Sequence, residues 1–131
     1  MNLLEQIALH LEALGLGTMA DGEHEGNIFW GTMPESPDAC ISLHATDAGL
    51  PGRRGGARIQ VVVRGRDDRY AFETCQRIAE EMADWNGYLA YHLARVTVTL
   101  INGAQGIGAD EQQRVLYSCN LRVHYCDYSD F

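Results

Sequence analysis

The stretch from Asn102 to Arg114, NGAQGIGADEQQR, has the glycine content of a phosphate-binding loop. Such a loop offers backbone N–H groups and leads into the N-terminus of a helix, whose dipole favours an anion. Here Gly103, Gly106 and Gly108 follow the order G-x-x-G-x-G, the reverse of the dinucleotide motif. The residues that follow alternate as in a strand, and Asp110 adds negative charge. We therefore interpret the stretch as a hairpin connection and expect no nucleotide or other cofactor.

Histidine and cysteine are the residues that would bind a transition metal. The chain has five histidines and four cysteines, but only His124 and Cys126 are spaced to share a strand face. A zinc site needs about four converging ligands. We interpret His124 as a sheet-surface residue and Cys126 as a packing residue, and we expect no metal site. The cysteines lack a C-x-x-C pair, which indicates reduced, mostly buried thiols.

Side chains for nucleophilic or acid–base catalysis form no recognisable constellation. No serine lies in a G-x-S-x-G turn, and the carboxylate pair Glu80 and Glu81 falls on the polar face of an expected helix. The sequence therefore predicts a protein that is not an enzyme.

The overall charge limits the partners. A formal net charge of −8 repels phosphate backbones, so we expect no sequence-specific nucleic-acid binding. No apolar run reaches the length of a membrane span, and the N-terminus lacks the features of a signal peptide. We expect no membrane partner and a protein made in the cytoplasm.

Cationic side chains concentrate in one part of the chain, beginning with Arg53, Arg54 and Arg58. They can form a solvated loop and strand edge, or a patch that docks on an acidic surface such as a neighbouring copy of this chain. The loop from Asp47 to Ala57 is rich in glycine, and we expect it to become ordered against a partner.

The elements that position these residues follow from hydrophobic periodicity. Apolar residues at helical spacing predict helices over residues 2–14 and from Asp67 or Asp68 to about residue 84. The second helix is expected to bury Ala71, Phe72, Cys75, Ile78, Ala79 and Met82. Alternating residues predict strands in NIFWGTM, ACISLHAT, RIQVVVRG, RVTVTLI and VLYSCNLRVHYC.

The order of these elements indicates an α+β fold. We expect a mainly antiparallel sheet of about five strands, with two helices packed on one face, in a single domain over residues 1–131. The segment WNGYLAYHLARV, residues 85–96, has no clear place in this plan.

Several segments together resemble the minor capsid and tail-terminator proteins of long-tailed bacteriophages and prophages. The likeness runs from the first helix to Tyr125. It is most specific in the strand IQVVVRGRD, in the start of the second helix with Tyr70 and Ala71, and in the Q-G-x-G-x-D hairpin before the last strand.

The resemblance implies a structural protein of the virion, assembled in the host cytoplasm. Proteins of this kind form a ring, commonly hexameric, that ends the tail tube at its head-proximal end. The implied partners are further copies of the chain, the tail tube protein and a head-completion or neck protein. We expect contacts through Arg53, Arg54 and Arg58 and through the hairpin of residues 102–113, including Gln105 and Asp110.

Two alternatives remain open from the sequence. The first is a head–tail connector, neck or minor capsid component that joins capsid and tail without ending the tube. The second is a small metal-binding or ligand-binding module whose ligands converge only in three dimensions.

Overall fold

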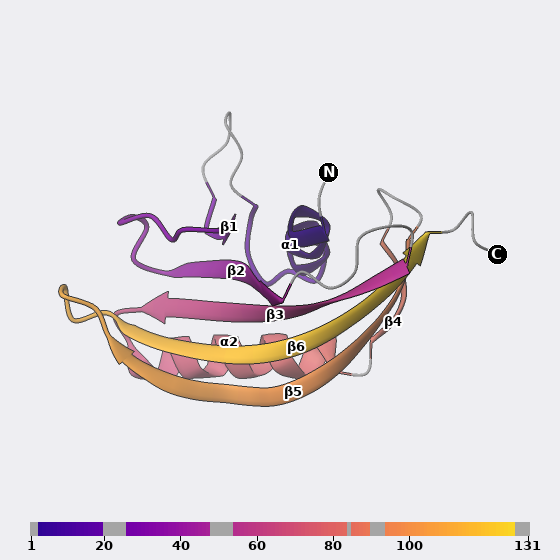
Figure 1. The fold of residues 1–131 in the computed structure, drawn as a ribbon. Helices are drawn as coiled ribbons and strands as arrows, with labels where there is room; N and C mark the ends of the chain where they lie inside the picture. Colours follow the sequence, from indigo (N-terminus) through magenta and orange to yellow (C-terminus); the bar gives the residue numbers. More distant parts are fainter. Residues whose placement is uncertain (1–2, 20–25, 48–53, 84, 90–93, 128–131) are drawn as a thin grey trace.

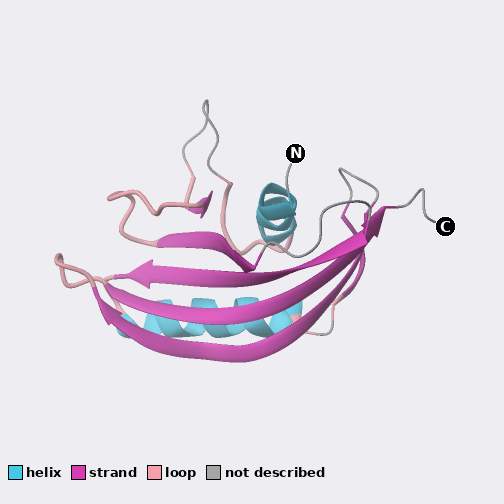
Figure 2. Ribbon diagram, in the orientation of Figure 1, coloured by secondary structure: helices cyan, strands magenta, loops and turns pink. Residues whose placement is uncertain are grey.

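A computed structural model describes residues 3–19, 26–47, 54–83, 85–89 and 94–127. The described part contains two helices and six strands (Figures 1 and 2). In chain order they are α1 (Leu3–Ala13), β1 (Ile28–Trp30), β2 (Cys40–Asp47), β3 (Arg54–Gly65), α2 (Asp68–Met82), β4 (Asn86–Leu89), β5 (Ala94–Ala109) and β6 (Val115–Asp127).

The strands form one sheet in the order β1-β2-β3-β6-β5-β4. The pairing of β1 with β2 is parallel, and the other neighbours are antiparallel. The expected α+β class with a mainly antiparallel sheet is confirmed. The sixth strand, β4, comes from the segment that the sequence left unplaced.

Helix α2 forms as its pattern predicts. The Asp67 side chain accepts a hydrogen bond from the Arg69 N–H and caps the N-terminus. The residues that it buries are Ala71, Cys75, Ile78, Ala79 and Met82. Phe72 was expected in this stripe, but it is 42% exposed and packs edge-on against Tyr117. It lies at the margin of the buried stripe of α2.

The core lies between the two helices and one face of the sheet. The alternating residues Ile59, Val61 and Val63 of β3 are fully buried, and Cys119 and Leu121 lie opposite Val61 and Ile59 on β6. Ile7 and Leu11 of α1 join the same cluster. The alternating apolar residues of the strands and the apolar stripes of the helices therefore pack together in one hydrophobic core.

The cysteines in this core are reduced, as expected for the three that can be described. Cys40, Cys75 and Cys119 are free and buried. The hydrogen bond with Cys75, together with burial, raises the pKa of the Cys119 thiol. These thiols are packing groups.

The sheet is strongly curled. Helix α1 contacts β1 and β2 near one edge and also β4 at the other edge. In Figure 1 the long strands β3, β5 and β6 bend along their length, and β4 lies at the end of the molecule nearest to α1. The His10 ring of α1 stacks on Trp85, just before β4, with ring centroids 4.3 Å apart. Burial of the His10 ring lowers its pKa.

Two segments that the sequence predicts to be loops are partly strand in the structure. Strand β3 begins at Arg54, so residues 54–57 are part of the sheet and pair with β6, while residues 48–53 lie outside the described part. The glycine stretch is also mostly strand, because β5 continues to Ala109. Only the residues between Ala109 and Val115 form the hairpin turn. Backbone pairing with β6 overrides the local signal of the glycines.

Candidate assembly surface

The hairpin turn between β5 and β6 is fixed by its own polar groups. The Asp110 Oδ1 atom accepts hydrogen bonds from the backbone N–H groups of Gln112 at 2.9 Å and Arg114 at 3.0 Å. The Asp110 N–H in turn donates to the Arg114 carbonyl at 2.9 Å. Gln113 takes a positive φ of 64° at the tightest point. The turn is therefore a closed, hydrogen-bonded unit.

Arg114 ties this turn to a loop that is distant in the sequence. Its side chain is only 4% exposed, and its Nε atom lies 2.7 Å from Asp110 Oδ2. Its Nη1 atom lies 3.3 Å from Asp38 Oδ1 and also donates to the Glu35 carbonyl. A buried guanidinium needs such partners because an unpaired buried charge is costly.

Two arginines at the end of β3 hold the same loop. Arg64 is 4% exposed; its Nη2 atom donates to the Pro37 carbonyl at 2.7 Å, and its Nε atom donates to the Asp38 carbonyl at 3.1 Å. Arg66 donates from Nε to Asp38 Oδ2 at 2.6 Å, in an exposed ion pair. The loop between β1 and β2 is thus fastened over this end of the sheet.

The carboxylates in this network are ionised and stabilised. The hydrogen bond from Arg66 lowers the pKa of Asp38. The Arg114 backbone N–H lowers the pKa of Asp110, and the Arg114 side chain adds to the effect. Burial alone would lower the pKa of Arg114, but its bonds to Asp110 and Asp38 outweigh burial and raise it. We call the six residues Glu35, Asp38, Arg64, Arg66, Asp110 and Arg114 the hairpin clamp.

Beside the clamp, strand β5 changes character along its length. Residues Ala94–Thr97 pair with β4, and the Val98 N–H donates to the Trp85 carbonyl at 2.8 Å. From Thr99 to Ala109, no described strand pairs with the outer side of β5. Helix α2 reaches this outer side, where Gln76 Oε1 accepts a hydrogen bond from the Ala104 N–H at 3.0 Å. We call residues 99–109 the open half of β5.

The open half is irregular, uncharged and partly apolar. Its pairing with β6 shifts between Leu100 and Asn102, between Asn102 and Gln105, and between Gly106 and Gly108. Ile101 is 39% exposed and Ile107 is 47% exposed. Gly103 suits its position because a β carbon at residue 103 would lie 3.0 Å from Gln76 Oε1. The open half is therefore a candidate contact surface.

A serine and a histidine also meet on β2, although no motif indicated it. Ser42 Oγ donates to the Gly31 carbonyl at 2.5 Å and lies 2.9 Å from His44 Nε2. Because the serine proton is directed at the carbonyl, the histidine acts as the donor between the two side chains. Ser42 is also fully buried. The pair therefore fastens the end of β1 to β2 and does not present an activated hydroxyl.

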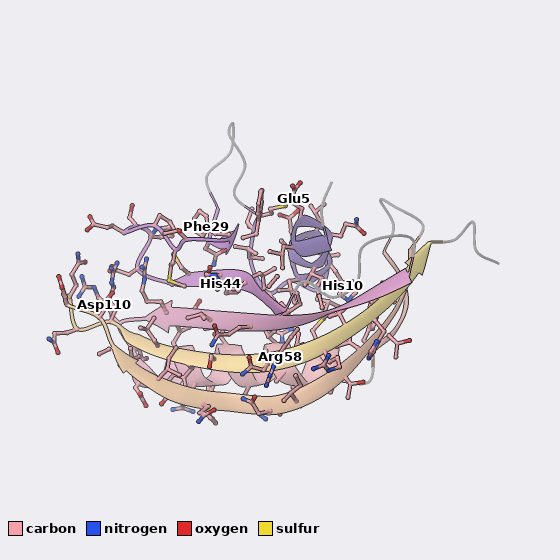
Figure 3. The ribbon with its side chains drawn as sticks, viewed as in Figure 1. Glu5, His10, Phe29, His44, Arg58 and Asp110 are labelled. Atoms are coloured by element: carbon pink, nitrogen blue, oxygen red, sulfur yellow. The ribbon has the colours of Figure 1, made fainter. Side chains whose placement is uncertain are left out.

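The predicted contact residues do not form one site. Arg53 lies outside the described residues, and Arg54 begins β3 opposite Cys126. Arg58 is exposed on the face of the sheet away from α2, opposite Arg122 (Figure 3). Asp110 lies at the other end of the strands, as Figure 3 shows.

The separation can be estimated from the strand geometry. Arg122, the partner of Arg58, is seven residues along β6 from Val115, which is about 23 Å at about 3.3 Å per residue. Gln105 is exposed in the open half, opposite Ser118. It belongs, with Asp110, to the hairpin that the sequence predicts as a contact surface. The arginine patch and the hairpin are thus two regions.

Sequence reasoning missed the clamp residues Arg64 and Arg114. The sequence predicts Arg64 on a strand, as part of the cationic concentration that begins at Arg53, and Arg114 at the end of the hairpin connection, and it gives neither residue a structural role. The one local signal is the spacing of Asp110 and Arg114, which suits a turn closed by an ion pair. The acceptors on Glu35, Pro37 and Asp38 could not be found from spacing.

Metal-binding clusters and membrane-spanning helices are both absent from the described residues. These residues contain no group of three or more histidine, cysteine or acidic side chains that could hold a metal ion. They also contain no helix with the length and apolar character needed to cross a bilayer.

Comparison with known proteins gives a family. The model of a family described as bacteriophage tail terminator protein matches residues 10–126. No curated protein matches the chain. One solved structure, of a protein without a descriptive name, is similar at 12% sequence identity, with a TM-score of 0.47. The alignment covers 78% of this chain and 80% of the other protein's chain. That likeness is too weak to add to the argument.

Proposed function

The chain belongs to the bacteriophage tail terminator family, and we propose that it is a non-enzymatic structural protein that ends the phage tail tube as a ring of identical copies. The observation that carries this proposal is the family match over residues 10–126. Membership in the family supports a structural role in the phage tail. The finer statements, a hexameric ring at the head-proximal end and joining to the head-completion proteins, are part of the proposal.

The described geometry is compatible with such a role. A protein that caps a tube needs surfaces that keep their shape, because both partners must fit them repeatedly. The hairpin clamp gives one end of the sheet that rigidity through Arg114 and Arg64. The open half of β5 offers backbone groups and exposed isoleucines to a partner. We propose the tail tube protein and a head-completion or neck protein as the further partners.

A tube-length assay tests the proposal. Tail tube protein from the same phage is polymerised with and without the purified chain, and tube lengths and ends are measured by electron microscopy. We expect shorter tubes with a ring of added density at one end. Tubes of unchanged length with bare ends would contradict the terminator role.

The same assay separates the neck alternative. A head–tail connector or neck component would bind heads or finished tails without limiting the growth of the tube. Binding to completed tails with no change in tube length would therefore favour that alternative over a terminator.

A further inference from the structure

Two strips of this acidic chain carry no charged side chain and lie on opposite edges of the sheet. The first is Val96–Ala109, the longest run in the sequence without Asp, Glu or Arg, and it contains the open half of β5. The second is Gly26–Pro34, which contains β1. The sheet order places β1 at one edge and β4 with β5 at the other. Met19 forms a bridge with Ile28 on the outer side of β1, so the exposed part of this edge is its end at Trp30.

Each strip exposes a large apolar side chain. Trp30 at the end of β1 is 46% exposed, and Ile107 in the open half of β5 is 47% exposed. The charged residues on the outside of α2, including Glu73, Arg77 and Glu80, show how this chain treats a surface that stays in water. Natural edge strands are usually protected by charged side chains. An uncharged, apolar edge therefore indicates a surface that a partner covers.

The charge of the chain favours a second copy at these two edges. Two molecules of net charge −8 repel each other, and the repulsion is smallest where neither surface carries carboxylates. A single external partner would need one such edge. Two different edges on opposite sides of one sheet are what a head-to-tail contact between identical copies requires, and such contacts repeat until a ring closes.

We propose that the open half of β5 in one copy binds the Trp30 end of the β1 edge of the next copy, with Ile107 and Trp30 as the apolar anchors. This inference rests on the proposed ring and specifies how its copies meet. The backbone groups of the open half supply hydrogen bonds, as in other complexes where a partner adds to a sheet edge. The pairing with β6 shifts at three points along the open half, which makes this edge irregular. Only a partner whose strand fits the same irregularity can pair with it.

The test uses two variants that each damage one edge. Trp30→Lys alters the β1 edge, and Ile107→Lys alters the open half of β5. Thr97→Lys is the matched control, because Thr97 is an exposed residue of the same strand where β4 already pairs. Thermal unfolding checks that all three variants fold, and native mass spectrometry over a concentration series measures the oligomers.

We expect the wild type and Thr97→Lys to form the same closed oligomer. Each edge variant should need at least about a tenfold higher concentration to assemble, as expected when a central anchor is lost. Mixing the two edge variants should give a heterodimer that does not grow, because only the intact β5 edge of one and the intact β1 edge of the other can meet.

Several outcomes would overturn the inference. They are assembly of either edge variant at wild-type concentrations, homodimers of Trp30→Lys formed through two intact β5 edges, absence of the heterodimer, and a wild type that stays monomeric throughout. The tube-length assay separates these failures from failure of the proposed function. A wild-type chain that caps tubes while the edge variants assemble normally would keep the terminator role and reject these edges.

Discussion

The two halves of β5 differ in regularity, and the difference follows from what lies beside them. In the first half, β4 pairs with the strand, Trp85 bonds to Val98, and Val96 and Val98 are buried. In the open half the pairing with β6 shifts repeatedly and the isoleucines are exposed. A strand that is paired on both sides is held to a regular pleat, whereas an edge can accept bulges at little cost.

The comparison also shows two ways to keep an irregular edge in place. The far end of the open half is held by the hairpin clamp, through Asp110 and Arg114. Its middle is held by a single side chain of α2, Gln76. The three changes below alter the core, the clamp and the single contact in turn, and their expected effects decrease in that order.

The largest effect should come from the core beneath the boundary between the two halves. Leu121 is fully buried opposite Leu100, so Leu121→Ala should lower the free energy of unfolding by about 2–5 kcal/mol. Ile107→Ala in the open half should lower it by less than Leu121→Ala, by about 0.5 kcal/mol, because about half of this residue is already exposed. Urea unfolding measures both. Equal losses in the two variants would mean that the open half is packed in the free chain.

The next effect concerns the clamp. Arg114→Ala removes bonds to Asp110, Asp38 and the Glu35 carbonyl, so the urea midpoint should fall and the turn amides should exchange faster. Arg66→Ala is the control, since its pair with Asp38 is exposed and should matter less. If Arg66→Ala were as damaging, Asp38 and not the buried Arg114 would be the centre of the clamp.

The clamp also predicts a dependence on acid. The pKa values of Asp38 and Asp110 are lowered in the folded chain, so both add stability above their unfolded pKa, about 4. This stability is lost as the pH falls through the lowered folded values. Because Arg114 contributes to both shifts, Arg114→Ala should lose less stability than the wild type on acidification. If Arg114→Ala and the wild type lost the same stability on acidification, the bonds of Arg114 to the two carboxylates would not be the source of the pH dependence.

The smallest effect should come from the single contact to the open half. Gln76→Met keeps the length and helix preference of the side chain but removes the acceptor for the Ala104 N–H, which should cost about 1 kcal/mol. Exchange at the Ala104 amide should rise more than exchange in the first half of β5. Arg77→Met, on the exposed face of α2, is the control. Unchanged exchange at Ala104 would show that the hydrogen bond does not hold the edge.

The elements themselves could be predicted because their signals are local. The alternation of Ile59, Val61 and Val63 and the stripe of Ala71, Cys75 and Ile78 follow from backbone periods of 2 and 3.6 residues, and the structure buries both sets. The family resemblance was likewise carried by local segments, and the family match confirms it. Phe72 was placed wrongly because the periodicity does not mark where a helix face leaves the sheet.

The tertiary structure decided which polar residues are buried and which edge is open. Arg114 is buried because acceptors from a loop 76 residues away in sequence reach it at Asp38, and spacing along the chain contains no such information. The glycine stretch became a strand because β6 pairs with it, which outweighs its local preference for a turn. The sequence by itself determined the helices, most strands and the uncharged strips. Only the sheet order, set by contacts between distant segments, placed those strips at opposite edges.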